Sequence, residues 1–204
     1  MSNSVAASPP GAAPRATEPT RRTLSPRQAD TVDRLVKAGL AEIRESGFDD
    51  LTIRNVARRA GVAPATAYNY FSSREHLVTE LFWRRLSARR DPATASGASP
   101  LERVTATLRA ITTVVADEPE LSAACTQAML GADPEVVLLR YRIGAEMHRR
   151  VLQALGDDAD PEVVGALEIA ISGALLQTGM GYLTYDEMTE RLTGTAALLM
   201  RGEP

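Results

Sequence analysis

The sequence predicts an all-α protein of about nine helices, and three observations support this prediction. Apolar residues recur at helical spacing in one segment after another along the 204 residues. These segments are separated by helix-ending glycines and by helix-start signals, in which Ser, Thr or Asp stands just before Pro or Glu. The alternation of apolar and polar residues that marks a half-buried strand is not found.

The first predicted helix begins after Ser25 and ends at Gly47. Ser25 can cap this helix, Pro26 suits its first turn, and Gln28 completes a capping box. Gly47 is placed to end the helix in a left-handed backbone conformation. The apolar face between these ends consists of Val32, Leu35, Val36, Leu40 and Ile43.

The next two predicted helices are short and are joined by a glycine turn. Thr52 can cap a helix over residues 53–60, and Gly61 allows the tight turn that follows. Pro64 is a favourable first residue for a third helix, which we expect to run to about Phe71. Together these elements have the pattern of a helix-turn-helix.

A fourth helix is expected to start at a capping box from Ser72 to Glu75 and to reach about Arg90. Residues 91–99 are expected to form a loop of Pro, Ser, Gly and Ala, which is the best candidate for a boundary in the chain. Five further helices are expected beyond this loop, at about residues 101–115, 121–130, 134–155, 163–183 and 184–199.

Charge is divided unevenly along the chain, although the net charge is only -3. Residues 21–90 hold fourteen Lys and Arg against eight Asp and Glu, whereas residues 91–204 hold eight against seventeen. For DNA binding, a local basic patch matters more than the global balance. We therefore expect the basic part of the chain to face an anion.

Little in the sequence points to catalysis or to a cofactor. Cys125 is the single cysteine and there are two histidines, so thiolate-cluster and multi-histidine metal sites are not expected. We predict that Cys125 is a small buried hydrophobe rather than a redox sensor, and that His148 belongs to a solvated face. An enzyme is the second hypothesis, but no ligand cluster, phosphate-binding glycine loop or nucleophile elbow is found. We predict no metal, no cofactor and no catalytic residue.

The N-terminus and one apolar segment bear on where the protein resides. Residues 1–20 lack the apolar core of a signal peptide and are expected to be a disordered tail. Arg21 and Arg22 are either a solvated pair or an arm that reaches DNA. Residues 163–183 are long enough to span a bilayer and carry one charge, but Gly, Ser, Gln and Thr dilute them. We expect a buried packing helix there, no membrane partner and a cytoplasmic protein.

The third predicted helix has the two faces that a DNA-reading helix requires. Ala67 and Phe71, four positions apart, are expected to face inward and to fix its angle. The residues left outside are Ala65, Thr66, Tyr68 and Asn69. In the major groove an Asn can bond adenine and a small Ala can touch a thymine methyl group. Candidates with the reach to contact phosphate or, for Arg54, a guanine are Thr52, Arg54, Tyr68, Tyr70 and Arg74. The alternative is a plain helical corner with solvated arginines.

A specific pattern runs through residues 47–77. It consists of Gly47-Phe48, Leu51-Thr52, Ala57, Gly61-Val62, Thr66, Tyr68, Tyr70-Phe71 and the residues from Ser73 to Leu77. This run closely resembles the N-terminal DNA-binding domain of the TetR family (TetR/AcrR-like) of bacterial transcription regulators. Ala63 stands where that family often has a capping Ser, and Ala67 replaces a usual Leu. The third helix should therefore be lightly capped and thinly packed.

The resemblance implies an N-terminal three-helix helix-turn-helix DNA-binding domain at residues 21–72. It also implies a C-terminal helical ligand-binding and dimerisation domain at residues 73–204. The expected function is that of a repressor released from a double-stranded DNA operator by a small hydrophobic or amphipathic ligand. By this resemblance the DNA-facing positions are Arg54, Ala65, Thr66, Tyr68, Asn69 and Tyr70, and the backbone-contacting ones are Thr52 and Arg74. A ligand-independent structural or division-linked DNA protein is the alternative.

The C-terminal domain is expected to hold a ligand pocket between its central helices and a homodimer seam on its last two helices. The pocket candidates, each of which could equally be plain core, are Ile111, Gln127, Met129, Tyr141, Met147 and Gln177. In the last two helices, small residues permit close helix approach and leucines supply apolar area, although intramolecular core would explain both. The seam candidates are Gly165, Ala166, Ser172, Gly173, Ala174, Leu175, Leu176, Leu192 and Leu199.

Overall fold

The computed structural model describes residues 25–92, 96–157 and 159–202, and every regular element in these segments is helical. Nine α-helices and one short 3-10 helix make up the described part of the chain, which confirms the all-α prediction. The expected tail at residues 1–20 and the Arg21–Arg22 arm lie outside the described residues. No helix in the described segments combines the length and the apolar character that a membrane span requires.

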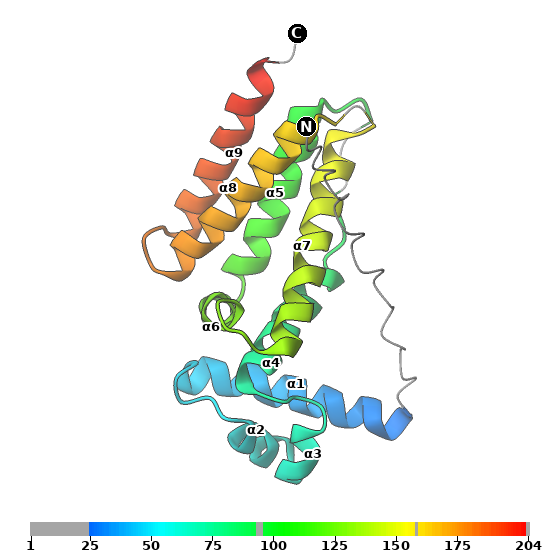
Figure 1. Ribbon diagram of the computed structural model, residues 1–204, viewed down its shortest axis with the longest axis vertical. Helices are drawn as coiled ribbons and strands as arrows, with labels where there is room; N and C mark the ends of the chain where they lie inside the picture. The colour runs from blue at the N-terminus through cyan, green and yellow to red at the C-terminus, as the bar shows by residue number, and fades with distance from the viewer. Residues whose placement is uncertain (1–24, 93–95, 158, 203–204) are drawn as a thin grey trace, which may run out of the picture.

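The helices form a small head and a larger body (Figure 1). Their bounds are α1 Pro26–Ser46, α2 Ile53–Ala60, α3 Pro64–Tyr68, α4 Arg74–Ala88, α5 Pro100–Ala116, α6 Pro119–Met129, α7 Pro134–Leu155, α8 Pro161–Gly179, α9 Tyr185–Leu199 and η1 Met200–Gly202. Helices α1 to α3 make the head. In the body, α5 packs against α7 and α9, while α8 packs against α6, α7 and α9. Helix α4 contacts α1 as well as α6 and α7, so it links the head to the body.

Most helix starts follow the capping signals of the sequence, and one cap is shifted by a residue. Capping boxes begin α1 at Ser25, α5 at Ser99 and α9 at Thr184, as predicted. The cap of α4 is Ser73 and not Ser72. The reason is that Ser73 has the extended backbone of a cap, and its hydroxyl accepts a hydrogen bond at 2.9 Å from the backbone N–H three residues later.

Two helices end earlier than the sequence pattern predicts. Helix α3 ends at Tyr68 rather than near Phe71, because residues 69 and 70 form a turn. Helix α8 ends at Gly179 rather than near residue 183, because Gly181 adopts a positive φ of 78° that stops the helix. The chain then turns back into α9.

Arg150 fixes α7 to the end of α4. This residue is only 2% exposed, and its guanidinium donates to the carbonyl oxygens of Leu86 at 3.0 Å and Arg89 at 2.7 Å. It also pairs with Glu146 at 2.7 Å, and Arg149 pairs with the same carboxylate at 2.7 Å. Hydrogen bonding to Arg149, and then to Arg150, lowers the pKa of Glu146 to about 2. This contribution to stability is therefore present above the ordinary pKa of a glutamate and is lost as the pH falls towards 2.

Three polar contacts, which we call the junction, join the head and α4 to the body. Glu118 precedes α6, is 7% exposed, and pairs with Arg44 of α1 at 2.7 Å and with Arg85 of α4 at 2.8 Å. Ser73 at the start of α4 donates a hydrogen bond of 2.6 Å to Asp133 at the start of α7. This hydrogen bond is the main cause of the lowered pKa of Asp133. A displacement of α6 or α7 would therefore act directly on the helices that carry the head.

Candidate DNA-reading surface and internal cavity

Helix α3 presents small and polar side chains from a buried support. Ala67 is fully buried and Phe71 is 3% exposed, so both face inward as predicted. Ala63 provides no side-chain cap, and Pro64 occupies the first turn of the helix. On the outer side Ala65, Tyr68 and Asn69 are exposed, and Thr66 is half-buried. The segment therefore has the outward face that a major groove can receive.

Two of the predicted DNA contacts also have roles within the head. Tyr70 is half-buried and packs against the apolar core. Thr52 is exposed, and its hydroxyl accepts a hydrogen bond of 3.1 Å from the backbone N–H of Asn55, which caps α2. The hydroxyl proton of Thr52 is donated to no other described residue, so capping and a phosphate contact are compatible.

Arg74 is held by the protein itself. Its Nη1 donates to the carbonyl oxygens of Phe48 at 3.0 Å and Asp49 at 2.7 Å, and its guanidinium carbon lies 4.6 Å from the centre of the Phe48 ring. Its Nε pairs with Glu75 at 3.0 Å. These contacts fix the loop between α1 and α2 against the start of α4. The proposed contact of Arg74 with the DNA backbone stays a prediction.

Helix α2 adds two exposed arginines to the same end of the molecule. Arg54 and Arg58 stand one helical turn apart and are both exposed. By contrast, Arg59 pairs with Glu42 at 2.6 Å and also with Glu45, so its charge is balanced within the head. Sequence reasoning identified Arg54 but missed Arg58. The four-residue spacing between them was the available signal.

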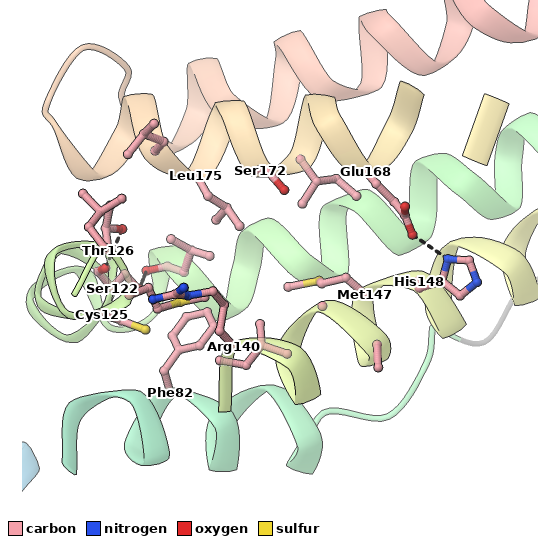
Figure 2. A pocket seen from close by; sticks show the side chains of 18 residues that line it. Phe82, Ser122, Cys125, Thr126, Arg140, Met147, His148, Glu168, Ser172 and Leu175 are labelled. Carbon is pink, nitrogen blue, oxygen red and sulfur yellow. Dashed lines mark hydrogen bonds and ion pairs between the residues drawn. The ribbon is translucent and has the colours of Figure 1, made fainter. Parts of the chain in front are cut away.

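A cavity of about 690 Å³ lies in the body, with α6, α7 and α8 as its principal walls (Figure 2). Most of its lining is apolar. Representative apolar lining residues are Phe82, Val115, Ile143, Met147, Ile171 and Leu175. A cavity of this size and character is typical of a binding site for a small molecule.

Two of the six predicted pocket residues line this cavity, namely Met129 and Met147. Ile111 is 1% exposed and belongs to the packed core instead. The remaining three, which are exposed and do not line the cavity, are Gln127, Tyr141 and Gln177. Helical spacing shows which residues share a face, but it does not show whether that face turns to a cavity, to another helix or to solvent.

The charged residues of the cavity lie at its two ends, and the hydroxyl of Ser172 lies between them. Figure 2 shows Arg140 beside Cys125 and Phe82 at one end, and the pair of His148 and Glu168 at the other. In that pair His148 Nδ1 lies 2.6 Å from a carboxylate oxygen of Glu168. His148, which we expected on a solvated face, is half exposed and also lines the cavity. Burial raises the pKa of the Cys125 thiol to about 12, in agreement with an inert cysteine.

Arg140 is the cavity residue that sequence reasoning should have noticed. It stands at helical spacing from Val136, Ile143 and Met147, all of which are buried. An arginine on the apolar face of a helix was therefore visible in the sequence. Its significance depends on the cavity, which the sequence does not reveal.

Only some of the residues predicted to form the dimer seam are exposed on the protomer, where a second subunit could contact them. Leu192 and Ala174 are 3% and 8% exposed and belong to the protomer's own core, while Ser172 and Leu175 line the cavity. Small residues favour close helix approach within a chain as well as between chains, which is why the sequence pattern did not separate the two. The exposed apolar side chains of α8, α9 and the turn between them are Ile169, Leu176, Met180, Tyr182 and Leu198.

A three-helix head with a short exposed helix, preceded by a helix with two exposed arginines and carried on a helical body, defines a helix-turn-helix DNA-binding protein. The family model for bacterial regulatory proteins of the tetR family matches residues 35–81. The model for the tetracyclin repressor-like C-terminal domain matches residues 97–199. The chain belongs to the TetR family, and it is a DNA-binding transcriptional regulator.

Individual relatives agree with this assignment. An uncharacterized HTH-type transcriptional regulator of Mycobacterium tuberculosis is 47% identical over 207 residues, covering 99% of this chain and 95% of the relative. The HTH-type transcriptional repressor KstR of Rhodococcus jostii is 31% identical, covering 85% of this chain and 84% of KstR.

Solved structures share the fold. A TetR transcriptional regulator from Rhodococcus sp. RHA1 superposes with a TM-score of 0.70 at 22% identity, over 87% of this chain and 100% of the other. Thermus thermophilus FadR, a TetR-family repressor solved with lauroyl-CoA, superposes with a TM-score of 0.61 at 19% identity, over 84% and 94% of the two chains.

Proposed function

We propose that this protein is a homodimeric repressor that binds a DNA operator and is released from it by a small apolar or amphipathic molecule. The observation that carries the proposal is the cavity of about 690 Å³, because its walls include α6 and α7, the helices that the junction connects to the head. The repressor name of the KstR relative and the lauroyl-CoA bound by FadR support the same reading.

In this proposal residues 21–72 read DNA, and residues 73–204 bind the ligand and form the dimer. A ligand that binds better to one arrangement of α6 and α7 shifts the protein towards that arrangement. Movement of Glu118 then displaces Arg44 and Arg85, and movement of Asp133 displaces Ser73. The two heads of the dimer thereby change their separation and no longer fit both operator half-sites.

Binding of the DNA upstream of the protein's own gene, measured by gel shift, tests the DNA-reading surface. We expect Tyr68→Ala to weaken binding about tenfold on all sequences, because the exposed phenol can reach phosphate, which carries no sequence information. We expect Asn69→Ala to change base preference, because a bidentate contact with adenine discriminates by about 1–3 kcal/mol. Tyr141→Ala is the matched control, since Tyr141 is 74% exposed on α7 and should leave DNA affinity unchanged.

Two results would contradict this part of the proposal. If the folded dimer gave no sequence-specific shift at moderate salt, the protein would not be an operator-binding repressor. If Asn69→Ala lost affinity equally on every sequence, Asn69 would not read a base. Binding to DNA that no small molecule in a screen weakens would favour a ligand-independent DNA protein.

The homodimer is tested on the outer face of α8. Ile169 is 75% exposed on the protomer, so Ile169→Glu leaves the protomer folded but places a charge in the proposed interface. We expect the dimer dissociation constant, measured by analytical ultracentrifugation, to rise about tenfold or more, equivalent to about 1.4 kcal/mol or more. Leu138→Glu is the control, because Leu138 is also exposed, at 56%, but lies on α7. Dissociation by the control and not by Ile169→Glu would place the interface elsewhere.

A further inference from the structure

We propose that the cavity binds an elongated apolar molecule with a single carboxylate, and that Arg140 receives this carboxylate. The inference rests on the cavity being the effector site proposed above, and it adds the chemical class of the ligand. It follows from the arrangement of the charged groups at the two ends of the cavity (Figure 2).

The guanidinium of Arg140 includes a buried donor that the described residues leave without a partner. Its Nη2 donates to the carbonyl oxygen of Gly131 at 2.7 Å, while its Nε is buried and has no hydrogen-bond partner among the described residues. Arginine stays protonated in proteins, so this end of the cavity carries a fixed positive charge. A buried donor without an acceptor is costly, and a bound acceptor removes that cost.

The neighbouring hydroxyl protons are already engaged within the chain. Ser122 donates to the carbonyl oxygen of Val115 at 3.0 Å, and Thr126 donates to that of Ser122 at 3.0 Å. Arg140 takes part in no ion pair among the described residues, whereas Arg149 and Arg150 on the same helix both do. The group that completes this end of the cavity must therefore supply an acceptor, and an anion is preferred. One guanidinium matches the two oxygens of a carboxylate.

The opposite end of the cavity disfavours binding of the ligand's carboxylate. There Glu168 and His148 are already paired, and a second carboxylate beside Glu168 would be repelled. Arg140 and His148 are eight residues apart on α7, which corresponds to about 12 Å along the helix. Between the two ends the lining is largely apolar, with Ile143 and Met147 on the same helix. The ligand is thus oriented, with its acid at Arg140 and its apolar body along α7.

The position of Arg140 also connects the ligand to the junction. Gly131, which Arg140 holds, lies two residues before Asp133, and Asp133 accepts the hydrogen bond from Ser73. A carboxylate that moves the guanidinium further into the cavity would also displace the loop that contains Gly131 and Asp133. An apolar molecule without an acid would fill the cavity without displacing this loop.

The test uses the full-length protein and measures binding by isothermal titration calorimetry. The probes are decanoate, decan-1-ol, decyl phosphate and decanoyl-CoA, each kept below micelle formation. We expect decanoate to bind about tenfold or more tightly than decan-1-ol, as a charge-assisted hydrogen bond implies. Arg140→Met should abolish this preference and retain binding of decan-1-ol. Arg142→Met, an exposed arginine on the same helix, should behave as the wild type.

Several results would overturn the proposal. For the wild type, these results are equal affinity for decanoate and decan-1-ol, or no binding of any probe. Tighter binding of decyl phosphate or decanoyl-CoA than of decanoate would also overturn it. For Arg140→Met, the contradicting result is a preference for the acid that survives the substitution. If Arg140→Met does not fold, Arg140→Lys takes its place, because it keeps the charge but loses the paired donors, and the acid preference should fall severalfold. Operator binding is measured separately by gel shift. If the wild type shows no acid preference but binds its operator, only the proposed ligand class and the role of Arg140 are refuted. A failure of operator binding by the wild type refutes the proposed function and leaves the acid preference standing.

Discussion

Replacing Arg150 with Ala is expected to lower the free energy of unfolding by about 3–5 kcal/mol, the cost of breaking a buried ion pair from one side. The change removes the hydrogen bonds to the carbonyl oxygens of Leu86 and Arg89 at the end of α4. It also leaves Glu146, whose side chain is 17% exposed, without its buried partner. Chemical denaturation at a fixed protein concentration measures the effect, since the stability of the proposed dimer depends on concentration.

The adjacent Arg149 supplies the control for this prediction. Arg149 pairs with the same Glu146 and also with Asp91, but its side chain is 46% exposed. Solvent screens an exposed pair, so Arg149→Ala should cost no more than about 1 kcal/mol. Equal losses of unfolding free energy in the two variants would show that the stabilising effect of Arg150 does not come from its burial.

Gly179→Ala is expected to lower the free energy of unfolding by about 2 kcal/mol, within the range for overpacking a core. A Cβ atom at Gly179 would lie 2.5 Å from Oγ1, 2.6 Å from Cγ2 and 2.7 Å from Cβ of Thr126 on α6. Because all three atoms lie close to the helix backbone, rotation of the Thr126 side chain does not relieve the clash. Helix α6 must move away from α8, and we expect the affinity for a cavity ligand to change as well.

Gly144→Ala provides the comparison. Gly144 lies inside α7, and a Cβ atom there would meet nothing within 4 Å. Alanine favours a helix by about 1 kcal/mol relative to glycine, so this variant should be as stable as the wild type or more so. If Gly179→Ala were equally well tolerated, the close approach of α6 and α8 would not constrain the body.

Local signals allowed much of the head to be predicted from the sequence. The second helix was predicted at residues 53–60 and is observed there, because Thr52 and Gly61 mark its two ends. The inward positions of Ala67 and Phe71 are confirmed for the same reason, since they follow from the spacing of residues in one short segment. The DNA contacts of this surface remain predictions.

The partners of several arginines depend on residues far away in the chain and could not be predicted. Arg74 is held by carbonyl oxygens of residues 48 and 49, and Arg150 by those of Leu86 and Arg89. Part of the cavity lining was not predicted, because Arg140 on α7 and Glu168 on α8 become lining residues only when these two helices pack together. Periodicity placed these residues on helices, but tertiary packing decided what they face.

The hydrogen bonds of Ser73 limit how the head could be exchanged between regulators. Its single hydroxyl caps α4 by accepting from His76 and also donates to Asp133 of the body. A chimera that joins this head to a foreign body would need a serine or threonine at this position and an acceptor at the start of the seventh helix. The swappable unit is therefore larger than the three helices of the head, and successful grafts should carry α4 together with residue 133.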